Sequence, residues 1–364
     1  MGIVHADCDL VPGLGALGRD VDPPTFPCSY GLSLAYAGLT APCKQSSLLD
    51  RLQSKHSSQM RSFETQAGLY DCSWNEANQG QVLTAGTDGV IKLWDLGTRD
   101  GFPVGDWREH TREVSGVDWN LVSKDIFASA SWDSTVRIWS PRSQASLRVI
   151  TDHAERGGPS SSVYGAIWAP HSPKLLLSFS GDGTARVLDT VNPQATAVKL
   201  DHHQGQEVLS GDWDKYNPNL VSTGCAGHAI FTWDLRNPSR PLATLLGHTY
   251  AIRRIQCSPH ATGVLASASY DMTVLLWDSL VSSRTHGAGA IPGGRLSTIH
   301  RAGGGARAEG LMGLPESVLD VCSGHTEFVS GLSFNLFSSS LLASCAWDRK
   351  VCLWRYPPRE SVFG

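Results

Sequence analysis

Histidine and aspartate are the side chains whose spacing in this chain could support acid–base chemistry. Three histidines each lie 23 residues before an aspartate, which in turn lies six residues before a tryptophan. The three sets are His110, Asp133 and Trp139; His248, Asp271 and Trp277; and His325, Asp348 and Trp354. A histidine held by a carboxylate can act as a general base, but with a strand serine or threonine these groups can also form a hydrogen-bonded chain. Because buried polar groups are generally paired, we expect the sets to be structural and predict no catalytic residue.

The adjacent pair His202 and His203 raises metal binding as a second kind of chemistry. A zinc site needs three or four ligands at recognisable spacings, and no third ligand accompanies this pair in such a pattern. One of the two histidines instead occupies the position that His110 and His248 hold in their own copies of the repeat. We therefore predict no metal site and no cofactor.

One ten-residue phrase occurs six times and explains the spacing of the histidine sets. The copies are GTDGVIKLWD (86–95), SWDSTVRIWS (131–140), SGDGTARVLD (180–189), CAGHAIFTWD (225–234), SYDMTVLLWD (269–278) and AWDRKVCLWR (346–355). Their tryptophan positions follow one another at 45, 49, 45, 44 and 77 residues. A period in the mid-forties with a Trp-Asp ending is typical of the WD40 β-propeller, which has four strands in each blade. The predicted fold class is therefore all-β, a WD40 β-propeller.

Two copies of the phrase depart from the pattern. Leu188 replaces the tryptophan in the third copy, and Gly227 replaces the turn aspartate in the fourth. We expect both blades to have an incomplete polar chain and a lower local stability, since each lacks one hydrogen-bonding group.

The repeat sets the boundaries along the chain. Residues 61–280 and 316–356 carry the blades, and residues 281–315 form an insertion rich in Gly, Ala and Arg that we interpret as a loop. Residues 357–364 are a C-terminal tail. Seven blades is the common closure for this period, and an open ring would leave bare strand edges. Residues 1–60, which lack both Gly-His and Trp-Asp, are therefore expected to supply a poorly defined first blade or to be disordered.

Composition argues against several functional classes. The formal charge of −4 and the pI near 6.3 argue against sequence-independent binding of nucleic acid. No apolar run approaches the ~20 residues of a membrane-spanning helix, so no membrane span is expected. The nine cysteines are odd in number and include no C-x-x-C pair, which favours reduced cytosolic thiols over a disulfide framework.

The repeat also predicts which side chains face a ligand. The residue that enters each inner strand and the residue before each turn aspartate should lie on one rim of the propeller. Bulky aromatic residues and two glutamates occupy these positions, which suits an amphipathic peptide helix with basic residues on its polar side. Arg253 should point to the channel mouth and either form an ion pair there or take an acidic group of the peptide. The predicted peptide-binding residues are Glu113, Trp132, Glu207, Arg253, Tyr270, Phe328 and Trp347.

Several longer phrases are more specific than a Trp-Asp ending. LLGHTYAIRRIQCSP followed by LASASYDMTVLLWD, and the later GHTEFVSGLSF, resemble the family of peroxisomal targeting signal 2 receptors, or peroxin-7. REHTREVSGVDW with SASWDSTVRIW, GDWDKYNPNLVSTG, WDLRNPSRP and RSFETQAGLYDCSW add to this resemblance. It runs from about 61 to 280 and from about 317 to 356.

The resemblance implies a shuttle receptor found in the cytosol and the peroxisome matrix. Such receptors bind matrix proteins through an N-terminal peptide with an Arg/Lys-Leu start and a His/Gln-Leu end. The peptide forms an amphipathic helix held between the propeller and a co-receptor, the long form of the type 1 signal receptor or an equivalent. The assembly then meets the peroxisomal docking complex. Glu113 and Glu207 would take the basic side chains of the peptide, and its leucines would pack on Trp132, Tyr270, Phe328 and Trp347.

Two other classes of protein stay open. A generic WD40 scaffold in a chromatin, trafficking or ubiquitin-ligase complex would use the same rim to bind other peptides. An enzyme built on a propeller is the second class, and the lack of a paired acid–base or metal constellation in the sequence counts against it.

Overall fold

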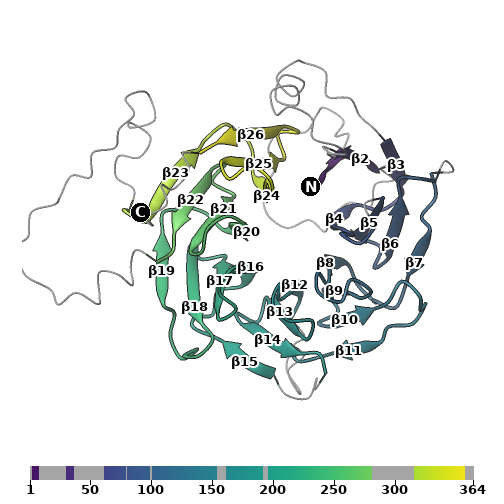
Figure 1. Cartoon of the computed structure of the whole chain (residues 1–364), viewed down its shortest axis with the longest axis horizontal. Coiled ribbons are helices and arrows are strands. Elements are labelled where there is room, and N and C mark those ends of the chain that lie inside the picture. The colour runs from purple at the N-terminus through teal and green to yellow at the C-terminus, as the bar shows by residue number, and fades with distance from the viewer. Residues whose placement is uncertain are drawn as a thin grey trace, which may run out of the picture.

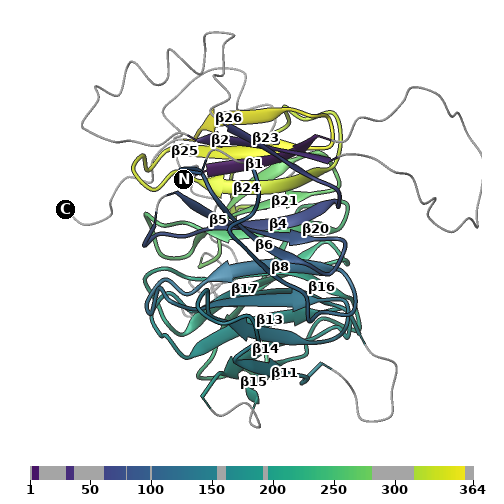
Figure 2. The same cartoon turned by 90° about the vertical axis from the view of Figure 1, so that its right-hand side faces the viewer.

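The computed structural model describes residues 2–7, 30–36, 61–78, 80–98, 101–153, 161–191, 196–280 and 315–356. Within these residues every regular element is a strand, and the strands form a ring of sheets around a central axis (Figure 1). In the side view of Figure 2 the strands run across the thickness of the ring, so the two ends of each strand lie at its two faces. The all-β propeller architecture is therefore confirmed.

Six blades follow one another around the ring, and each is an antiparallel meander whose first strand lies nearest the axis (Figure 1). The first two blades are β4 (Leu69–Trp74), β5 (Gln81–Gly86), β6 (Ile91–Asp95) and β7 (Gly105–Trp107); and β8 (Val114–Trp119), β9 (Phe127–Ser131), β10 (Val136–Trp139) and β11 (Arg148–Ile150). The next two are β12 (Val163–Trp168), β13 (Leu175–Ser180), β14 (Ala185–Asp189) and β15 (Thr196–Leu200); and β16 (Val208–Trp213), β17 (Leu220–Cys225), β18 (Ala229–Asp234) and β19 (Ala243–Leu246). The last two are β20 (Ile252–Cys257), β21 (Val264–Ser269), β22 (Val274–Asp278) and β23 (Val318–Cys322); and β24 (Val329–Phe334), β25 (Leu341–Ala346) and β26 (Val351–Arg355).

A further sheet of three strands lies between the last blade and the first (Figures 1 and 2). It consists of β1 (Gly2–Asp7), β2 (Tyr30–Tyr36) and β3 (Arg61–Thr65), paired in that order. Phe63 of β3 is buried against the Trp94 ring of the first blade, with 5.0 Å between ring centroids. A complete seventh blade remains a prediction. The predicted insertion, apart from residue 315, and the predicted tail lie outside the described residues.

The same tight turn joins the second and third strands of all six blades. In each turn one residue has a positive φ, between 58° and 77°: Gly89, Ser134, Gly183, His228, Met272 and Arg349. Left-handed backbone is costly for residues other than glycine, and the turn aspartate offsets part of this cost. In the second blade Asp133 Oδ1 accepts a hydrogen bond from the backbone N–H of Thr135 at 3.0 Å, which fixes the turn around Ser134.

A chain of hydrogen bonds runs through the second blade from this turn into the core. His110 Nδ1 lies 2.8 Å from Asp133 Oδ2, and His110 Nε2 lies 2.7 Å from Ser129 Oγ. The Trp139 indole N–H donates to the same Ser129 oxygen at 2.8 Å. The fifth blade repeats these contacts with His248, Asp271, Ser267 and Trp277.

The third and fourth blades have shortened forms of this chain. In the third blade His153 contacts Asp182 and Ser178, and Leu188 offers no indole to continue the chain. In the fourth blade, where Gly227 offers no carboxylate, His203 Nδ1 lies 3.0 Å from the Gly183 carbonyl oxygen and Nε2 lies 2.9 Å from Thr223 Oγ1. His203 thus fills the histidine position of its blade.

The sixth blade requires a correction to the predicted network. His325 contacts Asp348 at 3.1 Å and Ser344 at 2.8 Å. The indole nitrogen of Trp354, however, is buried and has no hydrogen-bond partner among the described residues. Trp354 therefore packs in this blade but is not part of its hydrogen-bonded chain. The spacing of the repeat predicted the position of Trp354, but it could not predict where the indole N–H points.

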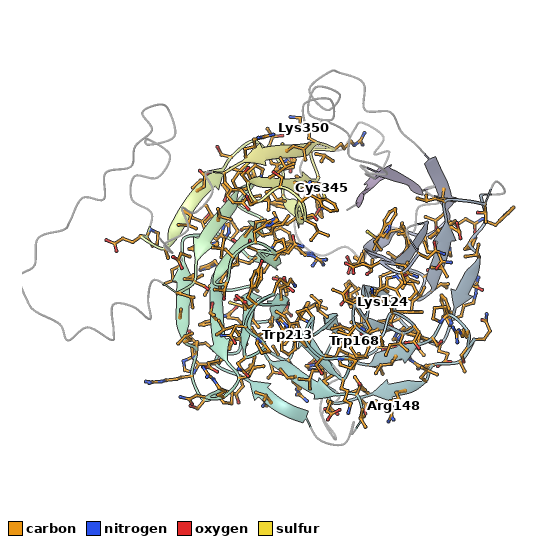
Figure 3. The ribbon with its side chains drawn as sticks, in the orientation of Figure 1. Lys124, Arg148, Trp168, Trp213, Cys345 and Lys350 are labelled. Carbon is orange, nitrogen blue, oxygen red and sulfur yellow. The ribbon has the colours of Figure 1, made fainter. Side chains whose placement is uncertain are left out.

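Hydrogen bonds near the axis join neighbouring blades. A side-chain oxygen on one inner strand accepts from a backbone N–H on the next inner strand, at distances between 2.7 and 3.2 Å. The donor and acceptor residues are Trp119 and Ser73, Trp168 and Asp118, Cys257 and Asp212, and Phe334 and Gln256. The buried indoles of Trp168 and Trp213 belong to apolar clusters that neighbouring blades share (Figure 3). The ring thus positions its inner strands through both polar contacts and apolar packing.

Replacing Asp271 by asparagine should lower the free energy of unfolding by about 1–3 kcal/mol, because His248 would lose a charged partner in a buried position. The matched control is Asp125→Asn at an exposed loop site, which should leave stability unchanged. Urea denaturation of both variants measures the difference. An Asp271→Asn protein as stable as the parent would show that the hydrogen-bonded chain does not stabilise the blade.

The same pair gives a pH test with a defined sign. Burial raises the pKa of the Asp271 carboxyl, but hydrogen bonds from His248 and Thr273 outweigh it and lower the pKa from 3.8 to about 2. A carboxyl with a depressed pKa stabilises the folded state above its unfolded pKa and loses this contribution as the pH falls. The stability difference between the parent and Asp271→Asn should therefore be constant above pH ~5 and shrink toward pH ~2.

Candidate peptide-binding face

In each blade one backbone hydrogen bond places the two predicted rim positions side by side. The residue before the tight turn donates its N–H to the carbonyl of the residue that enters the inner strand, at 2.9–3.1 Å. The donor and acceptor residues are Thr87 and Gly68, Trp132 and Glu113, Gly181 and Ser162, Ala226 and Glu207, Tyr270 and Ala251, and Trp347 and Phe328. All twelve therefore lie at the end of the ring where the inner strands begin, which we term the top face.

Three of the predicted aromatic residues form one cluster on the top face. The rings of Tyr270 and Phe328 lie 4.9 Å apart, and those of Phe328 and Trp347 lie 5.5 Å apart with their planes nearly perpendicular. These separations are typical of favourable aromatic pairs. Trp347 is 65% exposed, so the cluster offers apolar surface to a ligand. It spans the fifth and sixth blades.

A second aromatic pair lies on the first and second blades. The rings of Trp132 and Tyr70 are 5.4 Å apart, and the guanidinium of Arg112 lies 6.0 Å from the centre of the Trp132 ring. Glu113 lies next to this pair, and its carboxylate is 3.8 Å from Arg112 with 31% of the side chain exposed. The predicted residues Trp132 and Glu113 therefore lie side by side. Tyr70 lies next to them, although it was not among the predicted rim positions.

The second predicted acid, Glu207, lies on the fourth blade. Its side chain is exposed, and its Oε2 accepts a hydrogen bond from the Tyr164 hydroxyl at 3.1 Å. Burial, together with the Glu207 charge, raises the pKa of Tyr164 to about 12. Tyr164 thus stays a hydrogen-bond donor at neutral pH and holds one oxygen of the acid, which leaves the other oxygen for a ligand.

A β-bulge explains why Tyr70 and Tyr164 reach the top face. In all six inner strands the pairing register skips one residue directly after the first. The skipped residues are Tyr70, Ser115, Tyr164, Leu209, Arg253 and Ser330. A bulge re-aims the side chain of the extra residue and ends regular pairing. Both tyrosines occupy the same position of the repeat, but only the strand pairing shows that this position is the bulge.

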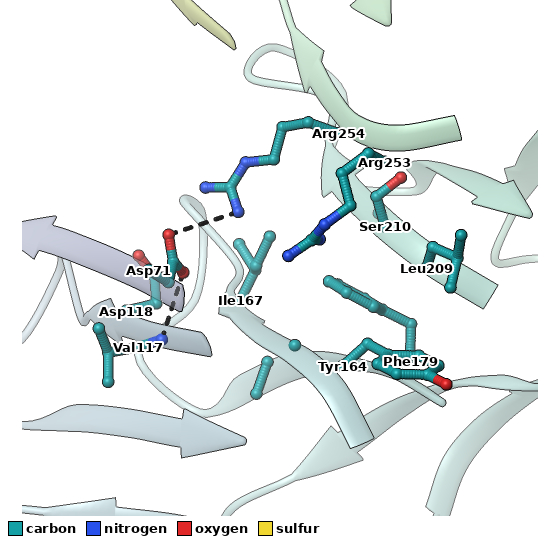
Figure 4. Close-up of a pocket in the computed structure, with 13 residues that line it drawn as sticks. Asp71, Val117, Asp118, Tyr164, Ile167, Phe179, Leu209, Ser210, Arg253 and Arg254 are labelled. Atoms are coloured by element: carbon teal, nitrogen blue, oxygen red, sulfur yellow. Dashed lines mark hydrogen bonds and ion pairs between the residues drawn. The ribbon is translucent and has the colours of Figure 1, made fainter. Parts of the chain in front are cut away.

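The two adjacent arginines of β20 have different surroundings (Figure 4). Arg254 reaches across the ring to β4 of the first blade, where its guanidinium lies 3.5 Å from Asp71 Oδ1. Asp71 also accepts a hydrogen bond from the Val117 N–H at 3.3 Å. Arg253, the bulge residue, points instead over a pocket whose walls include Tyr164 and Phe179. Both arginines line this pocket, and Arg254 in addition joins distant blades through its ion pair with Asp71.

The structure brings all seven predicted peptide-binding residues to one end of the ring, in three groups. One aromatic group lies on the first two blades and another on the last two. The third group consists of the acid Glu207 on the fourth blade and the cation Arg253 on the inner strand of the fifth. Within the described residues no group of three or more His, Cys, Asp and Glu side chains could hold a metal ion. No helix in this part of the chain is long and apolar enough to cross a membrane.

Comparison with known proteins gives the class first. The WD40 family profile, described as "WD domain, G-beta repeat", matches residues 57–95, 101–140, 239–278 and 316–355. Each match contains the outer strand of one sheet and the first three strands of the next blade: β3–β6, β7–β10, β19–β22 and β23–β26. The chain is therefore a WD40 β-propeller protein.

The relatives give the particular family. A Saccharomyces cerevisiae protein named peroxisomal targeting signal 2 receptor is 31% identical, with 81% of this chain and 85% of the yeast protein covered. The Mus musculus protein of that name is 37% identical, with 81% and 80% covered. The Dictyostelium discoideum protein of that name is 40% identical, with 76% and 75% covered. This chain belongs to the family of peroxisomal targeting signal 2 receptors, which confirms the resemblance seen in its sequence.

Two tryptophan substitutions should distinguish an aromatic residue of the top face from one of the core by their effects on stability. Trp347→Ala should change the free energy of unfolding by less than about 1 kcal/mol, because the side chain is mostly exposed. Trp277→Ala should cost about 3–5 kcal/mol, because this side chain is fully buried and its indole donates to Ser267. Urea denaturation measures both. A large loss of stability in Trp347→Ala would mean that this aromatic residue holds the blade together.

Proposed function

We propose that this chain is a receptor for type 2 peroxisomal targeting signals and that it binds the signal peptide on its top face. The observation that carries the proposal is family membership. The matches to this chain cover about 75–85% of the length of relatives that bear the name of that receptor. The chemistry of the top face supports it independently. A peptide with basic and leucine side chains on a helix needs acids and apolar surface close together, and this face has both.

The basic end of the peptide would contact the two acids. Glu113 has a partly exposed carboxylate beside the Trp132 ring, and Glu207 has a free side next to Tyr164. An arginine of the peptide would gain a charge-assisted hydrogen bond from either acid, on the order of 1.5–3 kcal/mol where water is partly excluded. The leucines would pack on the cluster of Tyr270, Phe328 and Trp347.

The remaining steps of import belong to the same proposal. A co-receptor, the long form of the type 1 signal receptor or its equivalent, would close over the exposed side of the bound helix. Affinity for the peptide alone would then be modest, because the second contact adds to the first only when both partners are present. The assembly would dock at the peroxisomal membrane, and the receptor would shuttle between the cytosol and the peroxisome matrix.

A generic scaffold is the competing function, and peptide chemistry distinguishes the two. A labelled type 2 signal peptide is titrated with the chain, in parallel with a peptide in which the first Arg and the last His are changed. The receptor proposal expects binding of the first peptide and a loss of at least about tenfold with the second. Equal binding of both, or binding of neither, would overturn it.

Glu113→Lys should weaken binding of the signal peptide by about tenfold or more, because a like charge would meet the basic side chain of the peptide. The control is Glu76→Lys, which makes the same change at an exposed site after the opposite end of an inner strand. Fluorescence anisotropy measures affinity, and thermal unfolding measures stability. We expect both variants to melt like the parent and Glu76→Lys to bind normally; a lowered melting temperature in Glu113→Lys alone would indicate a structural residue.

A further inference from the structure

Arg253 is a cation at the top face that has no partner within the described residues. Among the described residues none forms an ion pair or a hydrogen bond with its guanidinium, whereas the adjacent Arg254 is paired with Asp71. The β-bulge aims Arg253 toward the pocket, and its side chain is only half-buried. A guanidinium in such a position keeps all five of its N–H donors for a ligand.

The carboxylate of Glu207 is not paired with Arg253. Glu207 lies close enough that both charges act on the Tyr164 hydroxyl, with opposite effects on its pKa. Glu207 nevertheless contacts the hydroxyl and makes no ion pair with Arg253. The acid is thus held by Tyr164 and not by the cation, and the two charges can serve different groups of one ligand.

The pocket below Arg253 has an apolar floor. It is lined by the side chains of Ile167, Phe179 and Leu209. Gly165 is required for this floor, because a Cβ atom at that position would lie 2.2 Å from the Phe179 ring. Such a floor accommodates methylene groups, and the guanidinium at its edge accommodates an oxygen anion.

The other charges in the pocket do not cancel Arg253. Asp71 is neutralised by Arg254 and held by a backbone N–H. Asp118 also lines the pocket, and burial raises its pKa to about 7, so that it carries only part of a charge at neutral pH. Its Oδ2 accepts from the Trp168 N–H, which directs it to the neighbouring strand.

We infer that Arg253 is a specificity residue that binds a carboxylate of the signal peptide, an acidic side chain whose methylene stem lies on the Phe179 floor. The inference rests on the proposed receptor function and adds to it. The top face would bind an acidic residue of the signal peptide in addition to the basic and leucine residues of that peptide. Peptides carrying such a residue in register with the pocket are the preferred cargo.

The test uses the full chain without a co-receptor and a set of signal peptides. The peptides keep the Arg-Leu start and the His-Leu end and carry glutamate in turn at each position between them, each with a glutamine counterpart. The parent chain should bind one glutamate peptide about tenfold or more tighter than its counterpart. Arg253→Gln should abolish that preference while it binds the glutamine peptides normally, and Arg253→Glu should prefer lysine at the same position.

The matched control is Arg148→Gln, which removes the same charge at the outer edge of the ring (Figure 3) and should keep the preference. If no position prefers glutamate, or if Arg253→Gln weakens glutamate and glutamine peptides equally, Arg253 does not read an acidic side chain and the inference fails while the receptor function stands. If the parent binds none of the peptides, the receptor function fails and the inference with it.

Discussion

The hydrogen bond from the residue before each tight turn to the carbonyl that opens each inner strand sets what this protein presents to a ligand. It recurs in all six described blades. Since the donor follows one strand and the acceptor precedes its paired neighbour, the bond brings together residues almost twenty positions apart, such as Glu113 and Trp132. Because the bond is repeated in six blades, the two positions of the repeat that it joins lie on the same face of the ring. The binding chemistry thus depends on a backbone contact that no side chain alters.

The polar chains inside the blades hold the tight turns next to that face. Each turn aspartate holds a left-handed residue and, in four blades, also holds the histidine at the start of the same blade. Where the aspartate is missing, at Gly227, His203 bonds to the preceding blade through Gly183. That substitute contact links two blades, so the fourth blade, which carries Glu207, is still held in place without a carboxylate of its own.

Much of this could be predicted from the sequence because the repeat fixes register. Trp132, Tyr270 and Trp347 were placed by counting from the turn aspartate, and Glu113 and Glu207 by counting to the inner strand. Tyr70 and Tyr164 were not, because the bulge that aims them is a feature of pairing and leaves no spacing signal of its own. The contact between Arg254 and Asp71 was also out of reach, since it crosses the ring between blades that are not neighbours. Trp354 shows the opposite failure: its spacing is regular, and its indole still finds no acceptor among the described residues.

The most direct test is to locate the bound peptide on the ring. A type 2 signal peptide with a photo-reactive group beside its leucines is cross-linked to the full chain, and the attachment sites are read by mass spectrometry. Attachment is expected around Trp132, Tyr270 and Trp347, at the end of the ring where the inner strands begin. Attachment to the outer strands, or to Tyr216 and Phe337 in the loops at the other end, would contradict it.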